Sequence, residues 1–373
     1  MQVFWFLPTF GDGPHIGSLE GARPATPAYL RQIAQAADDL GYHGVLVPCG
    51  KTCEEAYVVS AALADATRRL RFLVATKPSS MSPTFAARLA SSLDRLSGGR
   101  FYLNVVVGGD AQELAGDGVF LDHDARYAQA AEFFQVWKGV LAGQKVDFSG
   151  EHVTVRGAEH LLPPAQRPYP RLFFGGSSPT GHAVAAEHFD TYLSWAEPLD
   201  AVREKISDVR ARADRFGRTL SYGLRVHVIV RKTEAEAWDA ANDIIKHVDR
   251  SAIDAAHRQF DRFDSEGQRR MTRLARSGNL VIAPNLWAGI GLVRGGAGTA
   301  LVGTPQQVAD RIEEYRDLGI ESFVLSGYPH LEEAYRVAET LFPLLPVERP
   351  DEPEAVGPIV NFVSPFGELP ARN

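Results

Sequence analysis

The chain has 373 residues, of which 45% are hydrophobic and 23% are charged, and its formal net charge is −7. This composition is ordinary for a globular protein, and no apolar run approaches the roughly 20 residues needed to cross a bilayer. The basic residues form no tract interleaved with aromatic side chains, so neither nucleic acid nor a membrane is the expected partner.

Cys49 and Cys53 are the two cysteines of the chain and lie four positions apart. So few thiols, together with an N-terminus that has no basic region and no cleavage site, predict a cytoplasmic protein. No second pair of ligands has a zinc-binding spacing, so no metal site is expected.

Eight short apolar runs alternate with helix-like stretches along the chain. Each run is rich in β-branched or aromatic residues and lacks polar alternation, which is typical of strands buried on both faces. The pattern predicts one α/β domain over residues 1–346, a parallel (β/α)8 TIM barrel with its active site on the loops at the C-terminal rim. The predicted strands are Val3–Pro8, Gly44–Pro48, Arg71–Thr76, Phe101–Gly108, Arg171–Gly176, Thr191–Trp195, Leu224–Val230 and Ser322–Tyr328.

Recognisable capping residues mark several of the helices between these strands. The stretch Pro27–Leu40 has apolar residues at helical spacing and is followed by Gly41, a typical C-terminal cap. Ser82 and Thr304 are each followed by proline, which indicates two further helix starts.

Two insertions interrupt the βα period. Residues 145–170 contain Asp147–Gly150 ahead of a short apolar run, which predicts a small hairpin over the barrel. Residues 250–298 are longer and end in a glycine-rich stretch, and a long insertion at a barrel mouth favours a mobile lid that excludes water. Residues 347–373 are rich in Pro and Glu and are expected to form a tail or arm.

The seventh predicted strand carries Arg225 and His227 on one face. A buried strand arginine is costly unless it meets an anion, and its guanidinium matches sulfonate, phosphate or carboxylate. An internal ion pair with a rim acid such as Glu197 is the alternative. His227 beside it is a candidate general base, although a lone strand histidine is more often a hydrogen-bonded core residue.

Other candidate site residues lie at the rim and in the second insertion. Trp195 ends the sixth strand, and Tyr328, which could donate a hydrogen bond to an oxyanion, lies with His330 after the eighth. Packing is the simpler role for Trp195 and Tyr328. Arg294 lies between glycines, where flexible backbone could bring its guanidinium over the rim to an anion. Most other arginines of that insertion are expected to form a solvated helical face.

Gly175–Ser178 follows the fifth strand and opens a helix, so backbone N–H groups and hydroxyls could hold a phosphate there. A tight turn with serine caps explains the spacing of Gly175, Gly176, Ser177 and Ser178 equally well. The glycine pairs near residues 11 and 289 lack the third glycine and the strand-turn-helix context of a dinucleotide-binding site.

Nearly the whole chain up to Pro346 resembles the FMNH2-dependent alkanesulfonate monooxygenases of the bacterial luciferase-like group. Six long stretches in order carry the resemblance: Leu114–His123, Phe174–Ser178, Arg225–Val230, Pro284–Gly289, Gly291–Gly303 and Ser326–Glu333.

The resemblance implies a two-component system in which a separate NAD(P)H-dependent reductase supplies reduced FMN. With O2 as co-substrate, an organosulfonate is cleaved to an aldehyde and sulfite. It further implies a cytoplasmic homotetramer. The implied flavin and sulfonate site falls on Cys53, Trp195, Arg225, His227, Arg294, Tyr328 and His330.

Within that site the resemblance assigns roles. Arg225, His227 and Arg294 would bind the sulfonate, and Arg294 would also close the lid and pass a proton. With Tyr328 these residues form the expected catalytic group. Cys53 and Tyr328 are expected at the flavin, together with the Gly175–Ser178 cradle.

The chain departs from the family in the loops after strands one to four. Phe10 replaces a histidine, Cys49–Thr52 replaces Thr-Gly-Arg-Ser, Lys77 replaces an arginine, and Val107–Ala111 replaces Thr-Gly-Ser-Asp-Pro. The sulfonate-binding positions are intact, so we expect a familiar head group with a different tail, Phe10 being among the residues that contact it. Sulfoquinovose is the favoured substrate; a simple alkanesulfonate, methanesulfonate or a non-sulfonate carbon compound are the alternatives.

Overall fold

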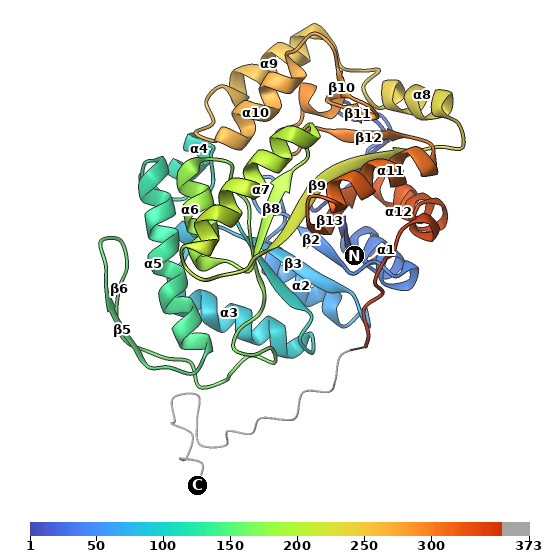
Figure 1. Ribbon diagram of the computed structural model, residues 1–373. Helices are drawn as coiled ribbons and strands as arrows, with labels where there is room; N and C mark the ends of the chain where they lie inside the picture. The colour runs from blue at the N-terminus through green and yellow to red at the C-terminus, as the bar shows by residue number, and fades with distance from the viewer. Residues whose placement is uncertain (353–373) are drawn as a thin grey trace.

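The computed structural model describes residues 1–352, and these form a closed parallel barrel of eight strands (Figure 1). Each strand pairs with the next in parallel register, and pairing of β8 with β9 closes the ring. The barrel strands are β1 (Gln2–Phe6), β2 (Gly44–Val47), β3 (Arg71–Thr76), β4 (Phe101–Val105), β7 (Leu172–Phe174), β8 (Thr191–Trp195), β9 (Ser221–Val230) and β13 (Ile320–Ser326).

The predicted TIM barrel is therefore confirmed, and all eight apolar runs are barrel strands. β9 is the longest at ten residues and begins three positions before the predicted run. Its C-terminal half has a second parallel partner, β12 (Ala300–Gly303), in addition to β13. Two antiparallel strands extend the sheet beyond β12, namely β11 (Leu286–Trp287) and β10 (Val281–Ala283).

The helices cover the outside of the barrel and end where the capping residues predict. Thr26, Ser82 and Thr304 accept hydrogen bonds from the first turns of α1, α3 and α11, and Gly41 ends α1 at φ 86°. The helices are α1 (Pro27–Leu40), α2 (Ala56–Ala64), α3 (Pro83–Leu96), α4 (Ala111–Gly116), α5 (His123–Leu141), α6 (Pro179–His188), α7 (Leu199–Asp214), α8 (Glu234–Ile244), α9 (Arg250–Phe260), α10 (Glu266–Ala275), α11 (Pro305–Arg316) and α12 (His330–Thr340), with 3₁₀ turns η1 (Pro78–Ser80), η2 (Gly289–Leu292) and η3 (Phe342–Leu344). None of them is both long and apolar enough to cross a bilayer.

Two apolar layers stabilise the barrel. Inward-facing side chains fill its interior, among them Phe4, Tyr102 and Phe173, whose rings meet at centroid distances of 5.9–6.4 Å. Outward-facing side chains such as Trp5 and Phe101 pack beneath the helices. A filled interior leaves the C-terminal rim as the place where a ligand can enter.

The first insertion forms the predicted hairpin of β5 (Val146–Ser149) and β6 (Thr154–Ala158). The prediction that this hairpin lies over the barrel is wrong. The Glu132 carboxylate of α5 accepts hydrogen bonds from the N–H groups of Glu151 and Val153, which holds the hairpin against α5. No residue of the insertion lines the cavity at the rim.

The second insertion contains α9, α10, β10, β11 and η2 and lies at one end of the barrel (Figure 1). Its residues line the rim cavity, and its mobility stays a prediction. Of the expected tail, Glu348 forms an ion pair of 2.9 Å with the N-terminal amine of Met1. Residues 353–373 lie outside the part of the chain that the structure describes.

Candidate active site

A cavity of about 1050 Å³ opens at the C-terminal ends of the barrel strands. Its size is at the upper end of the range for ligand sites, roughly 300–1000 Å³. Most of the predicted site residues line it: Phe10, Cys53, Gly175, Gly176, Ser177, Trp195, Arg225, Arg294 and Tyr328. Three do not line it, namely Ser178, His227 and His330.

Arg225 is buried at the end of the barrel interior with only 4% of its surface exposed. Its Nη1 donates to the carbonyl oxygens of Val226 and Val324, at 3.0 and 3.3 Å, whereas Nη2 has no partner. Burial and the neighbouring Arg294 lower the pKa of Arg225 to about 9. An unpaired, desolvated cation on a cavity wall is a strong binding site for an anion.

Arg294 brings a second guanidinium to the same place. Its carbon Cζ lies 5.7 Å from the centre of the Phe6 ring, and that of Arg225 lies 4.8 Å from it. Its Nη1 donates to the carbonyl oxygens of Gly295 and Ala297, so its own backbone segment holds the side chain in position. Neither arginine has an ion-pair partner among residues 1–352, and the two converge on one region of the cavity.

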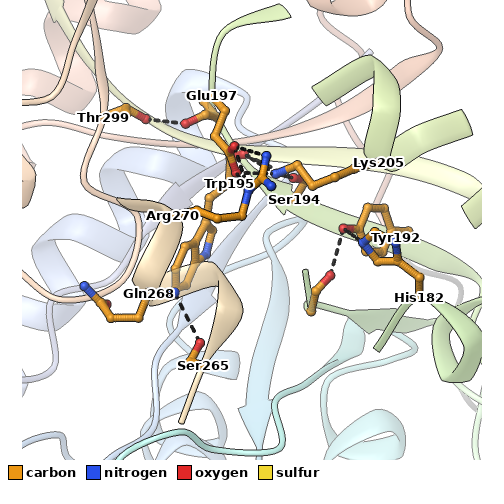
Figure 2. A network of polar contacts seen from close by, with 12 residues as sticks. His182, Tyr192, Ser194, Trp195, Glu197, Lys205, Ser265, Gln268, Arg270 and Thr299 are labelled. Carbon is orange, nitrogen blue, oxygen red and sulfur yellow. Dashed lines mark hydrogen bonds and ion pairs between the residues drawn. The ribbon is translucent and has the colours of Figure 1, made fainter. Parts of the chain in front are cut away.

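Glu197, the acid that could have paired with Arg225, is engaged elsewhere. It accepts hydrogen bonds from Lys205 Nζ at 2.6 Å and from Arg270 Nε and Nη2 at 2.9 and 2.5 Å (Figure 2). Burial alone would raise the pKa of Glu197, but Arg270 and Lys205 lower it overall. The ion-pair alternative for Arg225 is thereby excluded.

His227 is buried behind the cavity wall and both of its ring nitrogens are occupied. Ser326 Oγ lies 2.8 Å from Nδ1, and the Ala297 carbonyl oxygen lies 3.1 Å from Nε2. A carbonyl can only accept, so Nε2 carries the proton and Nδ1 accepts from the hydroxyl. Burial, followed by Arg225 and Arg294, holds the pKa of His227 well below its usual range. In this geometry His227 positions Ala297 and the ring of Tyr328, against which it stacks at 5.5 Å.

Because His227 is held neutral, we expect it to make folding sensitive to pH. Its folded pKa is lowered, so the unfolded chain binds the extra proton, and stability is lost as pH falls below about 6.5. The loss reaches at most about 1.4 kcal/mol per pH unit. His227→Gln, which can still donate to Ala297, should show a shallower decline in urea-unfolding free energy between about pH 7 and pH 5. Identical pH slopes for the two proteins would contradict a neutral His227.

Aromatic side chains form part of the cavity wall. Trp195 lies at the end of β8, and Tyr328 follows β13. Phe10 is 44% exposed at the mouth, with its ring 6.1 Å from that of Phe6. These rings provide apolar contact area beside the two arginines, which suits a molecule with an anionic head and a larger body.

His330 is tied to the loop between β1 and α1. Its Nδ1 lies 2.8 Å from Asp12 Oδ1 and its backbone N–H donates to Asp12 Oδ2 at 2.7 Å. The hydroxyl of Tyr29 donates to the same carboxylate at 2.6 Å. Burial raises the pKa of Asp12, but His330 and Tyr29 outweigh it and the net shift is downward. His330 therefore contributes by holding the loop, since it does not itself line the cavity.

At the predicted anion cradle, residues Gly175–Ser178, the backbone lies close to neighbouring side chains. A Cβ on Gly176 would lie 3.1 Å from the hydroxyl of Tyr127, so a larger residue would crowd that wall. Gly175, Gly176 and Ser177 line the cavity. Ser178 instead caps α6, its hydroxyl accepting from the Gly181 N–H at 3.1 Å. The serine-cap interpretation is confirmed for Ser178, whereas phosphate binding by Gly175, Gly176 and Ser177 stays a prediction.

Cys53 and Cys49 both line the cavity as free thiols. Burial raises the pKa of Cys53, and raises that of Cys49 to about 12. Both side chains are therefore neutral thiols at physiological pH and act as small contact groups toward a ligand.

Sequence reasoning missed Asn104 and the length of the first loop. Asn104 is a polar residue in the apolar strand β4; it lines the cavity, and its buried Oδ1 has no hydrogen-bond partner among the described residues. That single polar interruption was the available signal. The loop of residues 7–26, between β1 and α1, also forms part of the cavity wall, mainly through the stretch 10–19. This loop is far in sequence from the predicted lid of residues 250–298.

The fold and the site together define a barrel whose rim cavity is lined by two guanidinium groups without an ion-pair partner among the described residues. The chain belongs to the luciferase-like monooxygenase family, whose sequence model matches residues 1–322. Its class is therefore that of the flavin-dependent monooxygenases, which are oxidoreductases.

Solved structures support the same fold. Riboflavin lyase with modified FMN and riboflavin is 20% identical, with a TM-score of 0.79 and 95% of both chains covered. Long-chain alkane monooxygenase is 20% identical, with a TM-score of 0.76 and coverage of 92% of this chain and 90% of that one. EDTA monooxygenase from Chelativorans sp. BNC1 is also 20% identical, with a TM-score of 0.72 and coverage of 92% and 93%. Enzymes that use coenzyme F420 match as well, so the fold by itself does not select the flavin.

Proposed function

We propose that this protein is the oxygenase of a two-component system that cleaves the C–S bond of an organosulfonate. Reduced FMN supplies two electrons, and O2 supplies one oxygen atom to the carbon and one to water. The carbon leaves as an aldehyde and the sulfonate leaves as sulfite. A bulky polar sulfonate such as sulfoquinovose is slightly favoured over a simple alkanesulfonate or methanesulfonate.

The observation that carries this proposal is that two arginines without an ion-pair partner lie close together on one cavity wall. The guanidinium carbons of Arg225 and Arg294 lie 4.8 and 5.7 Å from the centre of the Phe6 ring, and neither group forms an ion pair within residues 1–352. A compact head group with three acceptor oxygens, such as sulfonate, can accept hydrogen bonds from both guanidinium groups at once. A luciferase-like enzyme acting on an uncharged carbon compound has no need of such a pair.

The described residues fit a flavin in the remainder of the cavity. Gly175, Gly176 and Ser177 offer backbone N–H groups and a hydroxyl at the start of a helix, where a phosphate is stabilised. Asn104 offers an unpartnered amide oxygen that suits a ring N–H. When bound, FMN supplies the redox chemistry that the side chains of the site lack.

The remaining site residues bind, orient and exclude water. Protonated Arg225, with Arg294, would hold the anion, and the hydroxyl of Tyr328, which also lines the cavity, would donate a hydrogen bond to it. Because the pKa of Arg225 is lowered to about 9, anion binding is strongest below that pH. The insertion that bears Arg294 covers one side of the cavity, which protects reactive oxygen chemistry from water.

The substrate tail is proposed to meet the loops in which the chain departs from its family. The replaced positions that line the cavity are Phe10, Cys49, Thr52, Val107 and Gly109. The whole cavity, of about 1050 Å³, is large enough for a second molecule beside a flavin. This arrangement supports a larger tail rather than a one-carbon sulfonate.

Three further features belong to the same proposal. A separate NAD(P)H-dependent flavin reductase would supply the reduced cofactor. The protein would act in the cytoplasm. It would assemble as a homotetramer.

Sulfite release tests the proposal directly. Purified protein with FMN, NADPH and a generic flavin reductase is assayed with methanesulfonate, octanesulfonate, sulfoacetate and sulfoquinovose. We expect sulfite from sulfoquinovose at a kcat/KM at least about tenfold above the others, an effect of about 1.4 kcal/mol. Sulfite from octanesulfonate alone would reverse the tail assignment. No sulfite from any of the four, in protein that binds reduced FMN, would refute desulfonation.

A further inference from the structure

The first turn of the helix α10 lines the cavity, and the helix is attached to the barrel just before its start and again at its middle. At its start, the Asp264 N–H donates to the Gly109 carbonyl at 2.7 Å, and its carboxylate meets Arg126 at 3.2 Å. Further along the helix, Arg270 reaches Glu197, which lies two residues beyond β8. The helix thus spans from the β4 side of the rim to the β8 side.

The attachment at Glu197 is the more buried of the two. Glu197 is 3% exposed and Arg270 donates to both of its oxygens (Figure 2). On the opposite side Lys205 completes the ion cluster at 2.6 Å, and Tyr315 donates to the Glu197 backbone carbonyl. Such a cluster is geometrically specific, because a displaced partner would leave a charge buried and unpaired.

The same helix holds the segment that carries Arg294. Gln268, two residues before Arg270, is 2% exposed, and its Oε1 accepts the Gly296 N–H at 2.8 Å. Its Nε2 donates to Thr272 at 3.1 Å, which fixes the amide orientation. Arg294 in turn donates to the carbonyls of Gly295 and Ala297, so the guanidinium follows the backbone that Gln268 holds.

Both α10 and the segment that carries Arg294 pack closely against the indole ring of Trp195. A Cβ on Gly267 would lie 3.2 Å from Trp195 Cζ3, so the first turn of α10 rests directly on the indole. A Cβ on Gly296 would lie 3.9 Å from Trp195 Cζ2. Movement of α10 away from Glu197 would therefore displace Gly296 and its neighbour Arg294 together.

We propose that Glu197, Arg270 and Gln268 form a latch that positions Arg294 over the cavity. The three are positioning residues: none of them needs to touch the reacting atoms, and they act through the backbone of 294–297. This inference rests on the proposed function in one respect only, the identity of the anion that Arg294 would bind. Its mechanical part, the order of the Arg294 segment, is independent of any substrate.

Limited trypsin digestion of the full chain tests the mechanical part. Trypsin cleaves after Arg294 when the segment opens, and the rate follows the population of the open form. In Arg270→Met and in Gln268→Leu, the new N-terminus at Gly295 should appear about tenfold faster, measured by mass spectrometry. Arg273→Met is the matched control, since Arg273 lies exposed on the same helix with no polar partner among residues 1–352, and its rate should equal that of the parent.

The cleavage rates of the variants decide the inference. If Arg270→Met and Gln268→Leu are cleaved after Arg294 no faster than Arg273→Met, while all three melt cooperatively, the latch is refuted. If Arg270→Met does not fold, Gln268→Leu decides alone, because it leaves the Glu197 cluster intact. Where sulfite release is observed, the latch variants should raise KM for the sulfonate about tenfold with a smaller change in kcat. Faster cleavage without any desulfonation would retain the latch and reject the proposed function.

Discussion

Replacement of Arg225 with methionine is expected to reduce kcat/KM for sulfite release by about 10²–10⁴-fold, equivalent to about 3–5 kcal/mol. The cause is the loss of a desolvated guanidinium that has no other ionic partner in the described residues, leaving the anion in contact with Arg294 alone. The measurement is steady-state sulfite release with saturating reduced FMN.

The same substitution should make the protein more stable. In the ligand-free protein Arg225 is buried beside Arg294, and burial is the largest cause of its lowered pKa, so its charge opposes folding. Methionine fills a similar volume without that penalty, and we expect the unfolding free energy to rise by about 1–2 kcal/mol. A gain in stability together with a loss of activity marks a site kept for function.

Arg88→Met provides the control for both measurements, because Arg88 is exposed on α3 and away from the cavity. It should change neither stability nor activity. An Arg225→Met enzyme with kcat/KM within about threefold of the parent would indicate an uncharged carbon substrate and reject the sulfonate. A fall in stability would show that Arg225 is a structural residue.

The second large effect is expected on stability, from Asp12→Ala. The Asp12 side chain is fully buried and accepts four hydrogen bonds, from Gly13 N–H, Tyr29 Oη, and the His330 backbone and ring. Removal leaves these donors unpartnered, of which the backbone and ring nitrogens of His330 are buried, and the unfolding free energy should fall by about 3–5 kcal/mol in urea melts. Activity should fall as well, because the loop that forms one wall of the cavity loses its anchor.

The pH dependence of the unfolding free energy separates the contribution of the Asp12 charge from that of its shape. Its folded pKa is lowered below 3.8, so its contribution is present above that value and is lost as pH falls below it. Asp12→Asn should therefore lose part of the stability at neutral pH and show a flatter decline toward about pH 3. Asp39→Ala, with Asp39 exposed in a surface pair with Arg68, should leave both unchanged. A parent-like unfolding curve for Asp12→Ala would show that the four hydrogen bonds contribute nothing net.

The barrel could be predicted from sequence because its strands are buried on both faces and read as apolar runs. β12 could not, since Ala300–Gly303 is a four-residue run after a glycine-rich stretch and its partner, β9, already has two neighbours in the ring. The hairpin was recognisable from its turn residues, but its place depended on Glu132, a distant acid. Local pattern determines the elements, whereas position depends on contacts between remote segments.

The same distinction applies to the site. Arg225 and Arg294 are placed in the cavity as predicted, because a charged residue in an apolar strand or a glycine-rich loop is visible in the sequence. The partners of His227, namely Ser326 and the Ala297 carbonyl, lie 99 and 70 positions away in the sequence. Because they occupy both ring nitrogens, His227 forms hydrogen bonds within the protein and does not face the cavity. No one-dimensional pattern reports whether a nitrogen faces the ligand or the core.

The strand β9 has a consequence for how this protein could be rebuilt. The chain leaves its end at Val230, runs through the insertion, and returns as β12 beside it, with Ala300 paired to His227 and Gly303 to Val230. Residues 231–299 thus begin and end at one place on the barrel, so exchanging them costs little loop-closure entropy. This region could be exchanged between related barrels as a cassette, leaving ring closure untouched and carrying the second arginine of the anion site with it.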